Sequence, residues 1–273
     1  MFLADYHLHT LDNSFDGRYP MVQMAAAAAS RGITQLCFTD HVDIDRSWDG
    51  GVRFDKWCFI MYEPMREEFL ETKKLPGLPE LRLGMELGAA NHYPDFAATL
   101  TAKPGLDFVI GSVHNLRGQT DFAFLPYDDP AAFPALLETY AGEILEVAET
   151  RLCDVIGHIG YPQRYMAQHG HDVSGLFPED LYRPVFCRLA ELGIGIEVNT
   201  SGLRDVIGHT LPPLSLLQLY RRCGGEIITC GSDAHRTEDA GCGICEAYDL
   251  LRQAGFRYVT TFRGRTPEFR KLD

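Results

Sequence analysis

The stretch Ala4-Asp5-Tyr6-His7-Leu8-His9-Thr10 ends the first apolar run of the chain and carries two histidines two residues apart. In an extended strand, residues i and i+2 point to the same face, so the imidazoles of His7 and His9 are expected to project side by side. Such a pair suits a metal ion, although histidines of this kind also serve as hydrogen-bonding residues of the core. The stretch alone leaves both interpretations open.

The same arrangement recurs along the chain, because later apolar runs also end in histidine, glutamate or aspartate. These ends are Thr39-Asp40-His41, Gly84-Met85-Glu86, Gly111-Ser112-Val113-His114, Ile156-Gly157-His158 and Gly231-Ser232-Asp233-Ala234-His235. Taken singly, each of these residues could be structural. Their common position at strand ends favours a multinuclear metal site built from nitrogen and oxygen ligands.

Strand-like apolar runs alternate with segments of helical character. Strands are expected at residues 3–8, 33–38, 81–86, 107–112, 154–158, 194–199, 226–231 and 258–262, and helices at 20–31, 57–74, 130–151, 178–192, 212–223 and 238–254. No segment resembles an interdomain linker, so residues 1–273 are expected to form a single domain. Seven or eight β/α units predict an α/β barrel of parallel strands, whose active sites lie at the C-terminal ends of the strands. A doubly wound sheet is the alternative, but its glycine-rich fingerprint is missing after the first strand.

The composition limits the partners. The net charge of −13 repels phosphate backbones, so extended nucleic acid is not expected as a partner. A small anionic substrate remains compatible where arginines and metal ions invert the local field. No apolar stretch approaches the roughly 18 residues that span a bilayer, and the start lacks a basic signal-peptide region. We therefore expect no membrane association and a cytoplasmic location.

The ordered motifs resemble those of the polymerase and histidinol phosphatase (PHP) superfamily. They are Asp5-x-His7-x-His9-Thr10, Ser14-x-Asp16-Gly17, Phe38-Thr39-Asp40-His41, Gly84-x-Glu86, Gly111-Ser112-Val113-His114, Gly157-His158 and Gly231-Ser232-Asp233-Ala234-His235. The resemblance covers nearly the whole chain. It implies a distorted TIM-like (β/α)7 barrel, with a site for two or three divalent ions of zinc, iron or manganese.

The resemblance also implies how the ligands are shared. The implied sets are His7, His9, Glu86 and Asp233 for the first ion, Glu86, His114 and His158 for the second, and Asp16, His41 and His235 for the third. In this scheme Glu86 bridges two ions. Asp12 is the alternative loop ligand, and the spacing of Ser14-x-Asp16-Gly17 favours Asp16 over it.

Within the superfamily, the chain looks most like the monofunctional histidinol phosphate phosphatases. The matching residues are Gly157-His158 with Arg164-Tyr165, and Asn199-Thr200-Ser201-Gly202-Leu203-Arg204. The resemblance implies phosphate binding by Arg164 and Arg204, and an arginine fork matches phosphate oxygens bidentately. Arg117 is a third candidate. The alternative for each arginine is a surface ion pair with the acidic excess.

The expected activity is metal-dependent hydrolysis of a small phosphomonoester, L-histidinol phosphate. Glu86 and Asp233 are the catalytic candidates as ligands of the ions, a metal-bridging hydroxide would attack phosphorus, and the general acid stays unidentified. Asp5 and Asp40 could orient ligand imidazoles. Asp43, Asp45 and Asp49 are candidates for an acidic rim, but the sequence favours a solvated loop for them.

Other functions compete with this one. A related phosphatase or phosphodiesterase could act on another metabolite or a nucleotide. An aspartyl-phosphate phosphatase would use Asp43-Ile44-Asp45 as its D-x-D motif. A non-catalytic metal-binding barrel is a third alternative, and the presence of every implied ligand argues against it.

Overall fold

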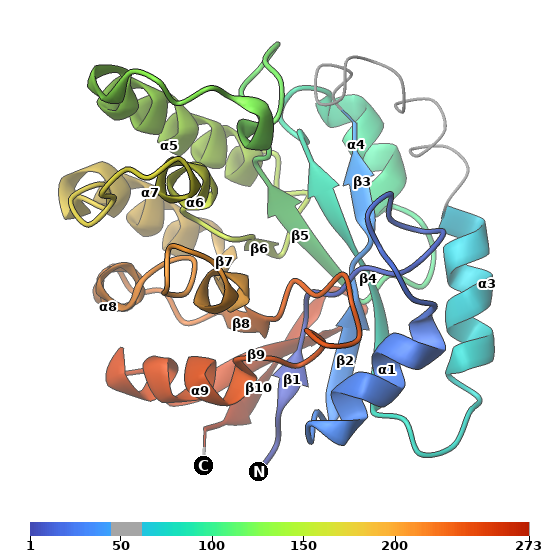
Figure 1. Cartoon of the computed structure of the whole chain (residues 1–273). Coiled ribbons are helices and arrows are strands. Elements are labelled where there is room, and N and C mark those ends of the chain that lie inside the picture. Colours follow the sequence, from blue (N-terminus) through green and yellow to red (C-terminus); the bar gives the residue numbers. More distant parts are fainter. Residues whose placement is uncertain (45–61, 273) are drawn as a thin grey trace.

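A mostly parallel sheet curls into a nearly closed barrel, and helices pack outside it (Figure 1). The computed structural model describes residues 1–44 and 62–272. The strands of the barrel sheet are β1 (Ala4–Asp5), β2 (Gln35–Phe38), β3 (His41–Asp43), β4 (Glu80–Gly88), β5 (Phe108–Ser112), β6 (Val155–Ile156), β7 (Gly195–Asn199) and β8 (Ile228–Gly231). Seven of them follow the order β1-β2-β4-β5-β6-β7-β8. The short strand β3 lies off this path and pairs with the later part of β4, after the part that pairs with β2.

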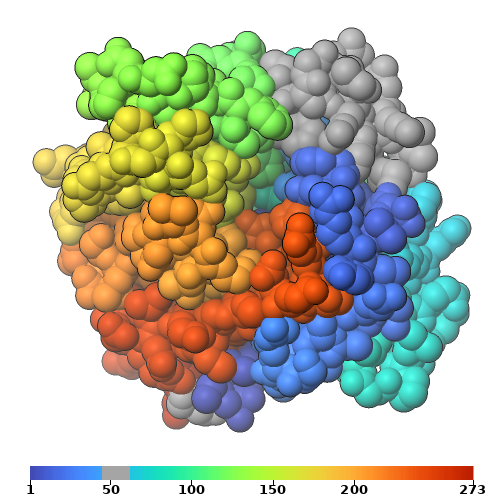
Figure 2. All heavy atoms as spheres, in the orientation of Figure 1, coloured from blue at the N-terminus to red at the C-terminus, as the bar shows by residue number. Residues whose placement is uncertain are grey.

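The first and last strands of this path meet and close the barrel. Leu8 and Ala234 form a parallel bridge, and the amide of Tyr6 donates to the carbonyl of Cys230 over 2.8 Å. The blue N-terminal and red C-terminal segments accordingly lie side by side on the surface (Figure 2). The expected distorted TIM-like barrel with parallel strands is confirmed.

The helices agree with most of the expected segments. They are α1 (Met21–Ser30), α3 (Tyr62–Thr72), α4 (Pro94–Thr101), α5 (Phe133–Glu149), α6 (Tyr161–Gln168), α7 (Glu179–Leu192), α8 (Leu214–Arg222) and α9 (Ile244–Gln253). The sequence did not predict α4 and α6, because helices of only 8 residues show little periodicity. The expected helix 238–254 begins only at Ile244, and residues 57–61 lie outside the described part of the chain.

The strand expected at 258–262 is present, but it lies outside the barrel sheet. The strand β9 (Tyr258–Arg263) pairs antiparallel with β10 (Thr266–Lys271) in a separate two-stranded sheet. Gly264 and Arg265, with φ of 53° and 63°, form the two-residue turn between them, as tight hairpins require. Although α9 could serve as the crossover that a further parallel strand needs, the strand hydrogen bonds of β9 go to β10, so this segment does not continue the parallel sheet.

The hairpin seals the amino end of the barrel. The Tyr6 hydroxyl donates to the Phe262 carbonyl over 3.3 Å and accepts the Phe262 amide at 3.0 Å. The Phe262 ring lies 4.9 Å from that of Phe108, which in turn meets Tyr6 edge to face at 5.2 Å. Aromatic rings therefore fill the amino half of the barrel interior, and the buried side chains of Gln35 and Arg82 there are hydrogen-bonded to Tyr6 and Phe262, respectively.

The larger part of the core lies between the strands and the surrounding helices. Among residues 1–44 and 62–272, no helix has the length and hydrophobicity that a membrane crossing requires.

The seal predicts a stability effect. Replacing Phe262, which is 2% exposed, with alanine should lower the free energy of unfolding by about 3–5 kcal/mol, because a cavity replaces the ring. Urea denaturation measures this change. Phe269 on the same hairpin is 48% exposed, so Phe269→Ala should change stability by about 0.5 kcal/mol or less. Equal effects of the two variants would contradict the sealing role.

Candidate functional site

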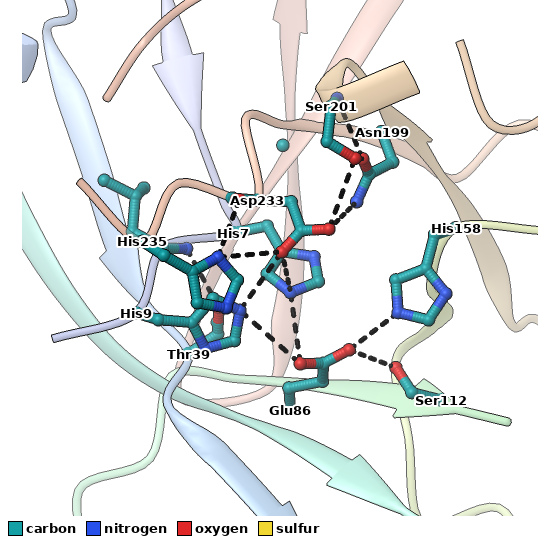
Figure 3. A network of polar contacts seen from close by, with 12 residues as sticks. His7, His9, Thr39, Glu86, Ser112, His158, Asn199, Ser201, Asp233 and His235 are labelled. Atoms are coloured by element: carbon teal, nitrogen blue, oxygen red, sulfur yellow. Dashed lines mark hydrogen bonds and ion pairs between the residues drawn. The ribbon is translucent and has the colours of Figure 1, made fainter. Parts of the chain in front are cut away.

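The residues expected as ligands converge at the carboxyl end of the barrel. They come from the ends of strands or from the loops that follow. Figure 3 shows His7, His9, Glu86, His158, Asp233 and His235 among them. The converging set is His7, His9, Asp16, His41, Glu86, His114, His158, Asp233 and His235.

Glu86 on β4 lies at the centre of this set. The side chain is 1% exposed, and its Oε2 atom faces three imidazoles. This oxygen lies 2.8 Å from Nδ1 of His41, 3.3 Å from Nε2 of His7 and 3.5 Å from Nε2 of His9. One carboxylate oxygen thus draws together residues that follow β1 and β2.

The second oxygen of Glu86 faces the other side of the barrel. Its Oε1 atom lies 2.7 Å from Nε2 of His158 and 3.0 Å from Nε2 of His114, and it accepts a hydrogen bond from the Ser112 hydroxyl at 2.7 Å. The two imidazole nitrogens are 3.3 Å apart. This geometry matches a carboxylate that reaches two neighbouring groups of ligands.

Asp233 follows β8 and faces the two N-terminal histidines. Its Oδ1 atom lies 3.3 Å from Nε2 of His9 and 3.7 Å from Nε2 of His7. Its backbone has a φ of 54°, a conformation that non-glycine residues rarely adopt and that clusters at functional sites. Its other oxygen accepts from Nδ2 of Asn199 at 3.2 Å. Backbone and side-chain contacts together aim this carboxylate into the site.

The loop after β1 supplies Asp16. The Asp16 carboxylate lies 3.1 Å from Nε2 of His235 and 3.7 Å from Nε2 of His41. Asp12, the other candidate in this loop, is exposed. The structure therefore brings Asp16 to the site, as its spacing favoured.

The charges of the cluster compensate one another. Burial would raise the pKa of Glu86, but His7, His41 and His114 outweigh it and hold this pKa well below its usual value. Burial opposes the charge of His41 as well, yet Glu86 and Asp16 raise its pKa to about 9. Burial together with His41 and His235 holds the pKa of His9 well below normal, which keeps this imidazole neutral.

The donor atoms fit metal ions. Buried polar atoms are normally hydrogen-bonded, yet several here have no hydrogen-bond partner among the described residues. These atoms are Nε2 of His7, His9 and His235, Nδ1 of His41, Oδ1 of Asp16 and Oε2 of Glu86. Three groups have ligand atoms within 4.8 Å of one another, namely His7, His9 and Asp233; His41, Glu86 and His114; and His9, His41 and His235. Imidazole and carboxylate are the ligands that zinc, iron and manganese accept.

A polar layer behind the ligands orients them. The Ser14 hydroxyl donates to Asp40 over 2.7 Å and lies 3.1 Å from Nδ1 of His9. Asp40, expected to orient an imidazole, therefore acts on His9 through Ser14. Asp5 instead accepts the amides of Ser232 and Gly241 at 2.8 and 2.9 Å, which fixes the backbone beside Asp233.

The solvated-loop reading of Asp43 was wrong. Its side chain is only 7% exposed and lies 2.8 Å from Nδ1 of His114 and 3.5 Å from Nδ1 of His41. It occupies this place because β3 pairs with β4 and sets Asp43 opposite Gly88, where a Cβ would clash with its Oδ1. Asp45 and Asp49 lie outside the described residues.

The sequence reasoning also missed Glu197. This residue of β7 is 1% exposed, and its Oε1 atom lies 2.7 Å from Nδ1 of His7. The available signal was a charged residue within the otherwise apolar strand Ile194-Gly195-Ile196-Glu197-Val198.

The structure separates the three candidate arginines. Arg164 on α6 lines the pocket with its side chain 11% exposed, and its Nη2 lies 3.8 Å from Oδ2 of Asp233. Arg204 pairs with Asp239 at 3.1 Å and donates to the Ser232 carbonyl at 2.8 Å. Arg117 is 54% exposed and pairs with Glu146. Of the three, Arg164 alone is brought to the described pocket.

The cavity above the cluster has a volume of about 230 Å³. Its wall beyond the histidines and acidic ligands is mainly aromatic, with one further carboxylate. The residues of this wall are Phe15, Asp121, Phe124, Tyr161 and Tyr165. The Tyr161 ring lies 4.8 Å from that of His158 and 5.2 Å from that of His114. It therefore covers one side of the cluster.

Comparisons with known proteins show the family of the chain. Residues 5–201 match the model of the PHP domain. The chain is 28% identical over 270 residues to the probable histidinol-phosphatase of Deinococcus radiodurans, covering 96% of this chain and 97% of that protein. It is 24% identical over 266 residues to the histidinol-phosphatase of Lactococcus lactis, covering 95% and 94% of the two chains.

A solved structure has the same fold. The histidinol phosphate phosphatase of Lactococcus lactis, complexed with zinc, L-histidinol and phosphate, superposes with a TM-score of 0.77 at 22% identity and covers 97% of this chain and 98% of that one. With its motifs, its fold and its match to the domain model, the chain belongs to the PHP domain family, as the sequence resemblance predicted.

The raised pKa of His41 predicts a pH effect in the metal-free protein. Folding raises this pKa from 6.5 to about 9, so the folded protein binds the proton more tightly than the unfolded chain. The resulting stabilisation should be complete below pH 6.5 and be lost as the pH rises through 9. An NMR titration of the ring measures the pKa. Asp16→Asn should lower it, and a value at or below 6.5 in the parent protein would contradict the prediction.

Proposed function

We propose that this protein is a metal-dependent phosphomonoesterase that hydrolyses L-histidinol phosphate to L-histidinol and phosphate in histidine biosynthesis. The observation that carries the proposal is the cluster of buried nitrogen and oxygen atoms that have no hydrogen-bond partner among the described residues, together with Arg164, which lines the pocket over this cluster. Similarity to histidinol-phosphatases over nearly the full chain supports the substrate. In this proposal, residues 1–273 form one hydrolase domain.

The proposed centre holds two or three divalent ions of zinc, iron or manganese. The donor set for them is His7, His9 and Asp233 on one side, Glu86 with His114 and His158 on the other, and Asp16, His41 and His235 at the rim. When bound, such ions supply Lewis acidity that polarises a phosphoryl group and makes water nucleophilic at neutral pH.

Arg164 would bind the phosphoryl oxygens. Its guanidinium is held by Asp233 at 3.8 Å and lies 5.5 Å from the centroid of the Tyr161 ring. Its buried Nε atom has no hydrogen-bond partner among the described residues, so it is available to an anion. Two nitrogens of one planar fork match two oxygens of a phosphate.

The wall of the cavity suits the other end of the substrate. L-Histidinol phosphate carries an ammonium group and an imidazole ring. The Asp121 carboxylate would attract the ammonium group, while Phe124 and Tyr165 offer aromatic faces to the ring. The Tyr161 ring excludes water from the His114 and His158 side.

Phosphate release tests the proposal. Protein reconstituted with zinc or manganese should hydrolyse histidinol phosphate with a higher kcat/KM than sugar, amino-acid and nucleotide phosphates. A chelator should abolish the activity, restored metal should return it, and His7→Ala should lack it. Comparable weak rates on all monoesters would reassign the substrate, and preference for a nucleotide diester would favour a phosphodiesterase.

Arg164→Ala should lower kcat/KM by about 10–150-fold, because hydrogen bonds to a charged group contribute about 1.5–3 kcal/mol. Arg164→Lys should retain part of the activity, since it keeps the charge without the fork. Arg117→Ala should change kcat/KM less than about twofold, because a surface ion pair contributes little. A larger loss in Arg117→Ala than in Arg164→Ala would contradict the proposed role of Arg164.

A further inference from the structure

We infer that Glu197 is a positioning residue that holds His7, His158 and Asp233 in the geometry needed to bind metal. The inference rests on the proposed metal centre and adds to it a residue outside the donor set. Glu197 acts through its neighbours, since its two oxygens point to groups behind the ligands.

The first contact fixes an imidazole. Oε1 of Glu197 lies 2.7 Å from Nδ1 of His7, and both side chains are buried. A carboxylate accepts hydrogen bonds, so Nδ1 of His7 carries the proton in this contact. Nε2 of His7, which lies 3.3 and 3.7 Å from Glu86 and Asp233, is then the nitrogen that would offer its lone pair to a metal ion held with these two carboxylates. This is the tautomer that binds a metal ion.

The second contact holds a strained backbone. Oε2 of Glu197 accepts the backbone N–H of His158 at 2.9 Å. His158 has a φ of 24°, in the positive range that is unfavourable for a residue with a side chain. The hydrogen bond helps to fix the turn that places Nε2 of His158 2.7 Å from Glu86.

The third contact extends to Asp233. Nδ2 of Asn199 donates to Oε2 of Glu197 at 3.1 Å and lies 3.2 Å from Oδ2 of Asp233. Glu197 and Asn199 are two residues apart on β7, so both side chains face the barrel interior. Through this pair, one carboxylate supports ligands from three different strand ends.

The barrel makes room for this carboxylate at Gly231. A Cβ at Gly231 would lie 2.1 Å from Oε1 of Glu197 and 2.4 Å from Cβ of His7. The Glu197 and His7 side chains meet in the space that a side chain at residue 231 of β8 would occupy, so this residue must be glycine. The close approach of β7, β8 and the end of β1 depends on this glycine.

Glu197→Gln is a specific test, because it keeps the shape but not the pattern of acceptors. Glu197 accepts on both oxygens, whereas glutamine accepts on one and donates from the other. Its amide would oppose either His7 Nδ1–H or the His158 N–H. We expect zinc affinity, measured by competition with a chromophoric chelator, to fall roughly 10–100-fold, as for other residues that orient metal ligands.

Asp154→Asn is the matched control. Asp154 also accepts a backbone N–H, that of Val109 at 2.8 Å, and pairs with Arg265, but it precedes β6 at the opposite end of the barrel. This variant should keep the zinc affinity of the parent protein even where it lowers thermal stability. If Glu197→Gln does not fold, Glu197→Asp keeps the carboxylate but draws its oxygens back from His7 and His158, and it should give the same loss of zinc affinity.

A second measurement reports on the tautomer. In the zinc-loaded parent protein, the ¹⁵N–¹H signal of His7 Nδ1 should be present and protected from exchange, and it should shift or vanish in Glu197→Gln. Zinc affinity equal to that of the parent would overturn the inference. Tight zinc binding by the parent without hydrolysis of histidinol phosphate would overturn the proposed function and leave this inference standing. A parent protein that takes up none of zinc, manganese and iron would overturn both.

Discussion

The site depends on the contacts between the buried carboxylate of Glu86 and the surrounding imidazoles. Five imidazoles that follow four strands reach its two oxygens, and they belong to His7, His9, His41, His114 and His158. A buried carboxylate without such partners would be strongly destabilised. The attraction between these groups therefore ties the carboxyl ends of the strands together and creates one polar cluster over the aromatic interior of the barrel.

This arrangement depends on strand register. The parallel register of β3 and β4 places His41 opposite Glu86 and Asp43 opposite Gly88. A shift of one residue would turn every side chain of a strand to the other face. The filled amino half, with Tyr6, Phe108 and Phe262 in contact, fixes the strands against such a shift. Packing at one end of the barrel thus preserves the geometry at the other.

The sequence predicted the site better than it predicted what supports the site. Strand ends can be read from local patterns, and a parallel barrel necessarily brings them together, so the residues from His7 to His235 could be placed. The residues that orient the ligands can lie far from them in sequence. Glu197 and His7 are 190 positions apart, and no local pattern links them. Asp43 likewise looked solvated until its strand was paired with β4.

The prediction of secondary structure failed where the local sequence signals were weak. The helices α4 and α6 are too short to show a period, and the apolar run at 258–262 is compatible with either a parallel strand or a hairpin. The turn at Gly264 and Arg265 decides that case. The arginines show the same limit, because the side chain of Arg204 follows a strand end as expected but is held by Asp239.

The barrel fixes the floor of the cavity more firmly than its wall. The floor is built from strand ends whose positions the barrel fixes, whereas Phe15, Asp121 and Tyr161 come from loops or short helices. Tyr161 belongs to both parts. Its ring covers His114 and His158, and its hydroxyl accepts a hydrogen bond from Tyr165 at 2.9 Å. A smaller residue at position 161 would enlarge the cavity and also admit water beside two imidazoles. Substrate preference and protection of the cluster are therefore coupled at this residue.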